Sequence, residues 1–357
     1  MEARRKLSFK RAIRENGVPI MCFILCGLGV LASGKPLSFL LQEAIGRMAR
    51  NSFIVLSLVV PIVAGLGLNF AIVLGAMAGQ AGLIAVAAAK IKGLPGLFTA
   101  VVVAFPLALL LGWAAGSIMN RAKGREMIAG MILGFFMNGV YMLVFLFGAG
   151  TVLPIKDPRM ILPQGYGLRN TVDLQVVKWS LDNLLKVRVG PISLPLATFA
   201  VTALLSMGIL KLFSTKLGQD MRAAGQDIRI AEVAGIKVDR TRMVAMLLST
   251  VLGAIGQIIF LQNIGTLNVY DSHGQTGTFA IAALLVGGAT VTKATVGQAL
   301  LGTFMFHLLF IVSPYAGQNL LGSAMVGEYF RAFVAYAVIA FSLALHSLQR
   351  SKMAVRR

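Results

Sequence analysis

Residues 51–89 read NSFIVLSLVVPIVAGLGLNFAIVLGAMAGQAGLIAVAAA and contain no Asp, Glu, Lys or Arg. A helix needs about 20 apolar residues to cross the hydrocarbon core of a bilayer, so this stretch is long enough for two crossings. Its middle, from 61 to 69, holds a proline, two glycines and an asparagine. Irregular backbone survives at membrane depth only where protein or a water-filled cavity covers it. We therefore predict two spans, 52–68 and 71–89, with a break between them that is a candidate for lining a polar path.

The rest of the chain has the same apolar character. Of its 357 residues, 57% are hydrophobic and 13% are charged, and the mean hydropathy is +0.82. Soluble domains average about 25% charged residues, so this chain carries too few to cover a water-facing surface. We predict an all-α polytopic membrane protein that forms one transmembrane domain in the lipid bilayer. The predicted spans are 18–33, 52–68, 71–89, 95–118, 127–149, 192–210, 243–262, 277–292, 294–313 and 329–346.

The number of full crossings lies between eight and ten. The break inside 51–89 and the short span before Lys293 both allow a broken or re-entrant helix. Most of the 33 Lys and Arg fall at the two ends of the chain and in segments on the same side of the predicted spans. The positive-inside rule makes that side cytoplasmic. We expect residues 1–17, 214–242 and 347–357 inside the cell and the segment 150–191 outside.

The basic residues do not predict nucleic-acid binding, although the isoelectric point is near 10.6. They cluster between apolar spans and lack the interleaved aromatic residues on which bases stack. The first apolar stretch is not followed by a small-residue cleavage site, so we expect it to remain as a span. The outer segment carries apolar residues at helical spacing and predicts a short amphipathic helix on the outer face. These residues are Leu174, Val177, Leu181, Leu184 and Leu185.

No motif for chemistry on the chain itself is present. The phosphate-binding pattern G-x-x-x-x-G-K-S/T does not occur. The histidines His273, His307 and His346 are scattered and do not have the spacing of metal ligands. We expect no enzyme activity, no catalytic residue, no cofactor and no metal. Apart from His307, no ionisable residue falls near the centre of a predicted span, which disfavours a pump driven by protons or sodium.

The loop 214–242 is the most informative segment. It predicts two short helical pieces broken at Gly225 and Gly235, with small residues that permit close approach. Its sequence fits the pattern G-x-x-M/L-R-A-x-G-x-D/N-x-x-x-A-x-x-A-G-I-x-V. The pattern resembles the cytoplasmic signature of the ABC importer permeases that serve ribose, other simple sugars, nucleosides and branched-chain amino acids. In that family the loop is a coupling helix that rests in a groove of the ATPase subunit.

The resemblance implies a set of partners and a place in the bacterial cytoplasmic membrane. The partners are ATP-binding cassette ATPase subunits, a second permease subunit (itself or a paralogue) and an extracytoplasmic substrate-binding protein. Hydrolysis of ATP would occur in the partner, and its binding would drive alternating access of the permease. On this reading the coupling residues of the loop are Arg222, Ala224, Gly225, Asp227 and Gly235.

The substrate is less well indicated. Arg125-Glu126-Met127-Ile128 with Met137-Asn138 is similar to the nucleoside and simple-sugar branch. The family's early and late glycine patterns are incomplete here, at Asn69-Phe70-Ala71-Ile72-Val73 and at Gly287-Gly288-Ala289-Thr290. A path without in-span Lys or Arg favours a neutral polar solute, a nucleoside or a monosaccharide, over an amino acid.

Five amides, four inside the predicted spans and one in the break between 52–68 and 71–89, are candidates for lining that path, because polar groups are costly in lipid unless they face a partner or a cavity. The alternative for each is a hydrogen bond between neighbouring helices. Two other functions remain open at this point, a branched-chain amino acid permease and a channel or facilitator without an ATPase. The five residues are Asn69, Gln80, Asn138, Gln257 and Gln262.

Overall fold

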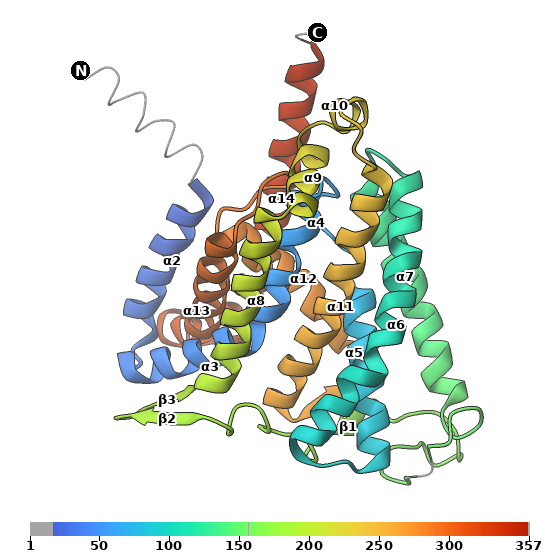
Figure 1. Cartoon of the computed structure of the whole chain (residues 1–357). Helices are drawn as coiled ribbons and strands as arrows, with labels where there is room; N and C mark the ends of the chain where they lie inside the picture. Colours follow the sequence, from blue (N-terminus) through green and yellow to red (C-terminus); the bar gives the residue numbers. More distant parts are fainter. Residues whose placement is uncertain (1–16, 156, 356–357) are drawn as a thin grey trace.

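The apolar stretches fold into the helices that the sequence predicts (Figure 1). The computed structural model describes residues 17–155 and 157–355. Within these residues each predicted span has a helical counterpart, and eight helices are long and apolar enough to cross a membrane. The ten counterparts are α2 (Gly17–Ser33), α3 with α4 (Leu37–Ser57, Val59–Val63), α5 (Ile72–Ala89), α6 (Gly93–Arg121), α7 (Glu126–Leu143, continued by the π-helical turn η1, Val144–Gly148), α8 (Leu196–Ser214), α11 (Val238–Ile264), α12 (Ser272–Val286), α13 (Val296–Leu321) and α14 (Ala324–Val355).

Eight long helices and two shorter ones agree with the prediction of about ten spans, some of them broken or re-entrant. Helices α2 and α12 have 17 and 15 residues, less than the ~20 that a crossing needs. The predicted cytoplasmic segments fall partly on residues 1–16 and 356–357, which lie outside the described residues. The rest of the predicted tail continues α14 as far as Val355.

Helix α3 begins earlier than predicted, at Leu37, and this corrects one inference. The span Leu37–Val63 contains Glu43, Arg47 and Arg50, so basic residues do occur within a membrane-crossing helix. The sequence does not reveal the earlier start of the helix, because these three charged residues lower the hydropathy of the segment before residue 52. The helix accepts them because α3 packs against other helices, and 72% of its most apolar window is buried.

Two helices are interrupted, as predicted. The chain leaves the helical path after α4 at Val63 and resumes it in α5 at Ile72. Gly65 and Gly67 adopt φ values of 78° and 70° in this break, which only glycine tolerates at little cost. Helix α12 is the second short piece, and residues 287–295 are non-helical before α13 begins.

The segment 150–191 does not contain the predicted amphipathic helix. Residues 175–185 form consecutive turns, and Trp179 has a φ of 55°, in the left-handed region that ends a right-handed helix. The predicted apolar stripe is divided, because Leu174 and Val177 are fully buried whereas Leu184 and Leu185 are more than half exposed. The segment instead contributes two small sheets: β1 (Thr171–Asp173) pairs with β4 (Thr266–Asn268), and β2 (Lys186–Val189) pairs with β3 (Ile192–Pro195).

The two extramembrane segments lie at opposite ends of the bundle. Helices α9 (Lys216–Gln226) and α10 (Ile228–Val233) lie at the end that also holds the first residues of α2 and the last residues of α14 (Figure 1). The β1 strand and the β2–β3 hairpin lie at the other end (Figure 1). We refer to these as the coupling end and the hairpin end.

A labelling experiment tests the predicted orientation. Ser180 and Ser214 lie near opposite ends of α8, so single cysteines placed there should face opposite sides of the membrane. The two native cysteines, Cys22 and Cys26, are buried and would be replaced by Ala in the background. A reagent that cannot cross the membrane should label the Ser180 position from outside intact cells and the Ser214 position only after the cytoplasmic face is opened. Labelling of both positions from one side would refute the orientation.

Candidate functional site

Helix α9 is fixed firmly to the coupling end of the bundle. The Thr215 hydroxyl caps it by accepting a hydrogen bond from the Gly218 N–H at 3.3 Å. Gly218 packs so closely on α8 that an added Cβ would lie 2.1 Å from the Leu212 carbonyl oxygen. The Met221 side chain is fully buried in the main core. A force applied to α9 is therefore passed to the bundle and not absorbed by a flexible loop.

Gly225 is the point at which α9 touches the interrupted helix. A Cβ added to Gly225 would lie 2.2 Å from the Val63 carbonyl oxygen, and one added to Gly65 would lie 2.8 Å from the Gly225 Cα. Both distances are below what real Cβ atoms show, so each position requires glycine. The coupling segment thus rests directly on the last residue of α4 and the start of the break that leads to α5.

The structure changes one detail of the predicted loop. The chain does not break at Gly225, which lies inside α9, but at Asp227, between α9 and α10. The Asp227 carboxylate caps α10 by accepting from the N–H groups of Arg229 and Ile230 at 2.9 and 3.2 Å. Sequence reasoning missed this because an Asp that caps a helix and a Gly that ends one are both expected at such a corner. Gly235 does end α10, with a φ of 81°.

The remaining coupling residues divide into buried and exposed ones. Ala224 is buried and packs with Ala231 and Val238, so α9, α10 and the start of α11 share a small core. Arg222 is exposed and lies over the Phe213 ring at 5.3 Å.

Helix α10 exposes apolar side chains at the coupling end. Ile230 and Val233 are 69% and 91% exposed, although both are β-branched apolar residues on a segment with charged neighbours. Solvent-exposed apolar side chains that cluster on a short helix mark a contact surface. No element of the described chain covers these two residues.

Two ion pairs tie the α6–α7 corner to the start of α11. The buried Arg242 guanidinium lies 2.5 Å from a Glu126 carboxylate oxygen and is 0% exposed. At the surface, Lys123 Nζ lies 2.8 Å from Asp239 and 3.3 Å from Glu232, a residue of α10. The hydrogen bond with Asp239 raises the pKa of Lys123, and the one with Glu232 adds to this, so the side chain stays cationic. Helices α6, α7, α10 and α11 are joined here.

The five predicted path residues are placed in three groups. Asn69, in the break, donates to the Ser249 hydroxyl of α11 at 3.1 Å, and its Oδ1 has no partner among the described residues. Gln257 of α11 is 0% exposed, and neither of its polar atoms has a partner there. Its Cβ faces Gly79 of α5. An unmade hydrogen bond on a buried polar group costs about 1–3 kcal/mol, so each of these atoms has room for a further hydrogen-bond partner.

Gln80 and Asn138 are brought together by two residues that sequence reasoning did not assign to the path. The Tyr141 hydroxyl of α7 donates to Gln80 Oε1 at 2.8 Å. His273, at the start of α12, lies between the two amides, with Nδ1 3.1 Å from Gln80 Oε1 and Nε2 2.7 Å from Asn138 Oδ1. We call these four residues the polar cluster. The cluster joins α7 to α5, which follows the break at 64–71, and to α12, which precedes the non-helical residues 287–295.

The hydrogen-bonding groups of the polar cluster are not all paired. Both ring nitrogens of His273 face carbonyl oxygens of amides, and Gln80 Nε2 has no partner among the described residues. A neutral imidazole has one donor and one acceptor, so one amide must present its NH₂ group to the ring. The cluster therefore offers both donors and acceptors that can be redistributed to a polar solute.

Gln262 belongs to a separate network at the hairpin end. Its Nε2 donates to Asp182 Oδ2 at 3.0 Å, and the same oxygen accepts from Asn263 Nδ2 at 2.7 Å. The other carboxylate oxygen accepts from the Thr198 hydroxyl at 2.5 Å. Asp182 is 6% exposed, so this network holds the outer segment to α8 and α11. No local pattern predicts this network, because the partners of Asp182 lie 16, 80 and 81 residues away along the chain.

The described residues contain no group of three or more His, Cys, Asp or Glu side chains placed to hold a metal ion. Two cavities in the described part of the structure lie away from the five amides. One is apolar, with a volume of about 250 Å³, between α2, α13 and the start of α14. The other lies under the β2–β3 hairpin.

Removal of a buried carboxylate tests the internal ion pair. Glu126→Ala leaves the buried Arg242 without its counter-charge and should destabilise the protein by about 3 kcal/mol. Glu232→Ala removes a carboxylate of the exposed network and should cost less than ~1 kcal/mol. The midpoint of thermal unfolding in detergent compares the two. Equal losses would show that the Arg242–Glu126 pair is not the dominant contact at this corner.

Curated relatives match parts of the chain. A nucleoside ABC transporter permease protein, NupC, of Lactococcus lactis is 31% identical over 44% of this chain and 52% of its own length. An autoinducer 2 import system permease protein, LsrC, of Klebsiella pneumoniae is 37% identical over 29% of this chain and 30% of its own. A xylose transport system permease protein, XylH, of Haemophilus influenzae is 32% identical over 28% and 26%. The chain spans about half or less of the length of these relatives.

Among solved structures, none matches this chain. A family model, described as "Branched-chain amino acid transport system / permease component", matches residues 43–343. The match begins within α3, ends within α14 and includes the α9–α10 loop, the helix break and the polar cluster. The chain therefore belongs to this family of transport-system permease components.

Proposed function

We propose that the chain is the membrane-spanning permease subunit of an ABC importer of the bacterial cytoplasmic membrane, with both termini in the cytoplasm. One observation carries the proposal: α9 is anchored in the bundle, and its Gly225 lies against the helix break at Val63 and Gly65. A helix held in this way at the cytoplasmic face can convert the motion of a partner into movement of a transmembrane segment. Asn69, one of the predicted path residues, lies in the same break, four residues after Gly65.

The energy comes from a separate ATPase in this proposal. Ile230 and Val233 of α10 form the apolar centre of the docking surface, and Arg222 and Arg229 lie exposed beside it. An apolar centre with a charged rim is the usual arrangement of protein interfaces. A second permease subunit, identical or paralogous, and an extracytoplasmic binding protein complete the importer. Alternating access follows when ATP binding draws the two α9–α10 elements together.

The substrate class is a small neutral polar solute, with a nucleoside or a monosaccharide favoured. The polar cluster supports this class because its four side chains are uncharged amide, phenol and imidazole groups. The names of the three relatives are consistent with this substrate class, since they refer to a nucleoside, autoinducer 2 and xylose. Arg50 of α3 does not argue against it, since its guanidinium donates to Asn263 in the hairpin-end network at 3.0 Å. A branched-chain amino acid is the alternative, and a channel without an ATPase leaves the exposed face of α10 unexplained.

A methyl group at Gly225 tests the coupling contact. Gly225→Ala places a Cβ against the Val63 carbonyl oxygen and should displace α9 from the break. Gly208→Ala is the matched control, because Gly208 lies in α8 with open space around it. We expect Gly225→Ala to reduce substrate uptake at least tenfold in reconstituted vesicles, with the ATPase still bound but no longer stimulated by loaded binding protein. Gly208→Ala should transport normally.

Two results of the Gly225 experiment would contradict the proposal. Wild-type uptake by Gly225→Ala would show that the α9 contact does not carry the coupling. Failure of the wild-type chain to co-purify with any ATPase would contradict the importer itself and favour a channel. Membrane insertion of each variant is measured first, so that a folding failure is recognised.

Substitution within the polar cluster tests the path. Gln80→Leu removes both the acceptor for Tyr141 and the unpartnered amide and leaves an apolar side chain of similar volume. We expect uptake to fall by a factor of about 2–150, since one or two lost hydrogen bonds to a solute are each worth about 0.5–1.5 kcal/mol. Basal ATPase activity should persist, which separates this defect from that of Gly225→Ala. Gln262→Leu, in the hairpin-end network, should change stability more than transport. Uptake that is unchanged in Gln80→Leu would remove the cluster from the path.

A further inference from the structure

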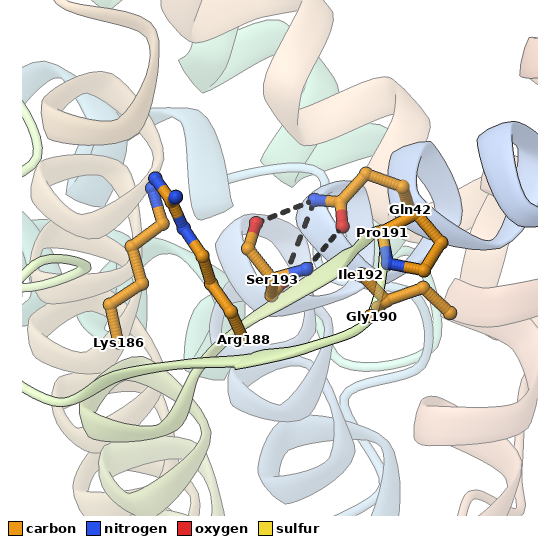
Figure 2. A pocket seen from close by; sticks show the side chains of 7 residues that line it. All are labelled: Gln42, Lys186, Arg188, Gly190, Pro191, Ile192 and Ser193. Atoms are coloured by element: carbon orange, nitrogen blue, oxygen red, sulfur yellow. Dashed lines mark hydrogen bonds between the residues drawn. The ribbon is translucent and has the colours of Figure 1, made fainter.

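The β2–β3 hairpin is held against α3 by one side chain. Gln42 accepts from the Ser193 backbone N–H at 2.6 Å and donates to the Ser193 hydroxyl at 3.0 Å, so its amide is fully used (Figure 2). Ser193 pairs with Arg188 across the hairpin, and Lys186 pairs with Pro195. Residues i and i+2 of a strand point to the same face, so Lys186 and Arg188 share the face that turns toward Gln42.

A cavity of about 350 Å³ opens beneath this face. Its lining residues include Lys186 and Arg188, whose side chains leave β2 on the same side in Figure 2. None of the seven lining residues is acidic, and neither cation forms an ion pair with a described residue. Two like charges on one face of a strand repel each other unless an anion lies between them. The cavity thus has the charge and the space for an anionic group.

The position of the hairpin indicates where that anion comes from. Lys186 lies opposite Pro195, and the next residue, Leu196, begins the crossing helix α8. Most of α8 is not buried inside the protein, so its surface faces lipid or another chain. The first residue of a crossing helix lies at the depth of the lipid headgroups. Two exposed apolar side chains lie close in sequence to the elements that line the cavity: Phe39, three residues before Gln42, and Leu196, directly after β3.

We propose that Lys186 and Arg188 bind the phosphate of an anionic phospholipid at the hairpin end, with its acyl chains along Phe39 and Leu196. A phosphate oxygen accepts from the Arg188 guanidinium, which binds phosphates with paired N–H donors, and a second oxygen accepts from Lys186. The lipid joins the hairpin, α3 and α8 into one unit at the membrane surface. This proposal depends on the membrane fold and not on the identity of the substrate.

The test measures lipid binding to the purified full chain. Phosphatidylglycerol is titrated in mixed detergent micelles, and bound lipid is followed by the midpoint of thermal unfolding and by native mass spectrometry. Lys186→Gln with Arg188→Gln should weaken binding about 30-fold, since a basic residue near a membrane surface contributes about 1 kcal/mol. Lys92→Gln with Arg159→Gln removes two exposed outer charges away from the cavity and should leave binding unchanged. The exchange Lys186→Arg with Arg188→Lys keeps both charges and should retain binding.

Several results would overturn the proposal. Equal affinity of the wild type and the Lys186/Arg188 double variant for phosphatidylglycerol would exclude the site. A shift of the same size with phosphatidylcholine would show that charge plays no role. Saturation by inorganic phosphate alone, without lipid, would assign the cavity to a free anion. Unchanged lipid binding together with loss of binding to an acidic partner protein would assign the hairpin to protein docking instead. A double variant that does not fold is replaced by the two single variants.

Discussion

The contact between Gly225 and the break after Val63 is the constraint on which the rest of the structure depends. Two backbones approach there to a distance that excludes any Cβ, on either side. Helix α9 cannot move toward the bundle without displacing the break, and the break cannot close without displacing α9. Every other element at the coupling end supports this contact: the Thr215 cap, the buried Met221 and the small core around Ala224 hold α9 in place.

Buried polar contacts then decide which helices move together. At the coupling end, the Arg242–Glu126 pair joins α11 to α7, so the start of α11 follows the α6–α7 corner. At the hairpin end, Asp182 accepts three hydrogen bonds and holds the outer segment to α8 and α11. Between these two ends lies the polar cluster, whose hydrogen bonds are incomplete. The bundle is therefore fastened at both ends, and the predicted path residues Asn69, Gln80 and Gln257 between them carry buried polar atoms without a partner among the described residues.

The sequence predicted the membrane fold, the helix break and two short helices in the loop 214–242, because these depend on local signals: apolar stretches without charges, a cluster of proline and glycine, and small residues among charged ones. It failed where distant residues decide the structure. The turns around Trp179 depend on its hydrogen bonds to Gln262 and Asn263, which lie far along the chain. His273 seemed isolated in the sequence, yet the fold places it between Gln80 and Asn138. The role of Gly225 also depends on Val63, whose position no local pattern reveals.

Hydrogen exchange at the break is the most direct test of this account. The amides of residues 64–71 would be followed in the assembled transporter, first without nucleotide and then with a non-hydrolysable ATP analogue bound to the partner ATPase. If α9 transmits the motion through Gly225, exchange at 64–71 changes together with exchange at 216–226. A change confined to 216–242, with 64–71 unaffected, would contradict the account, because the coupling helix would then move without moving the break.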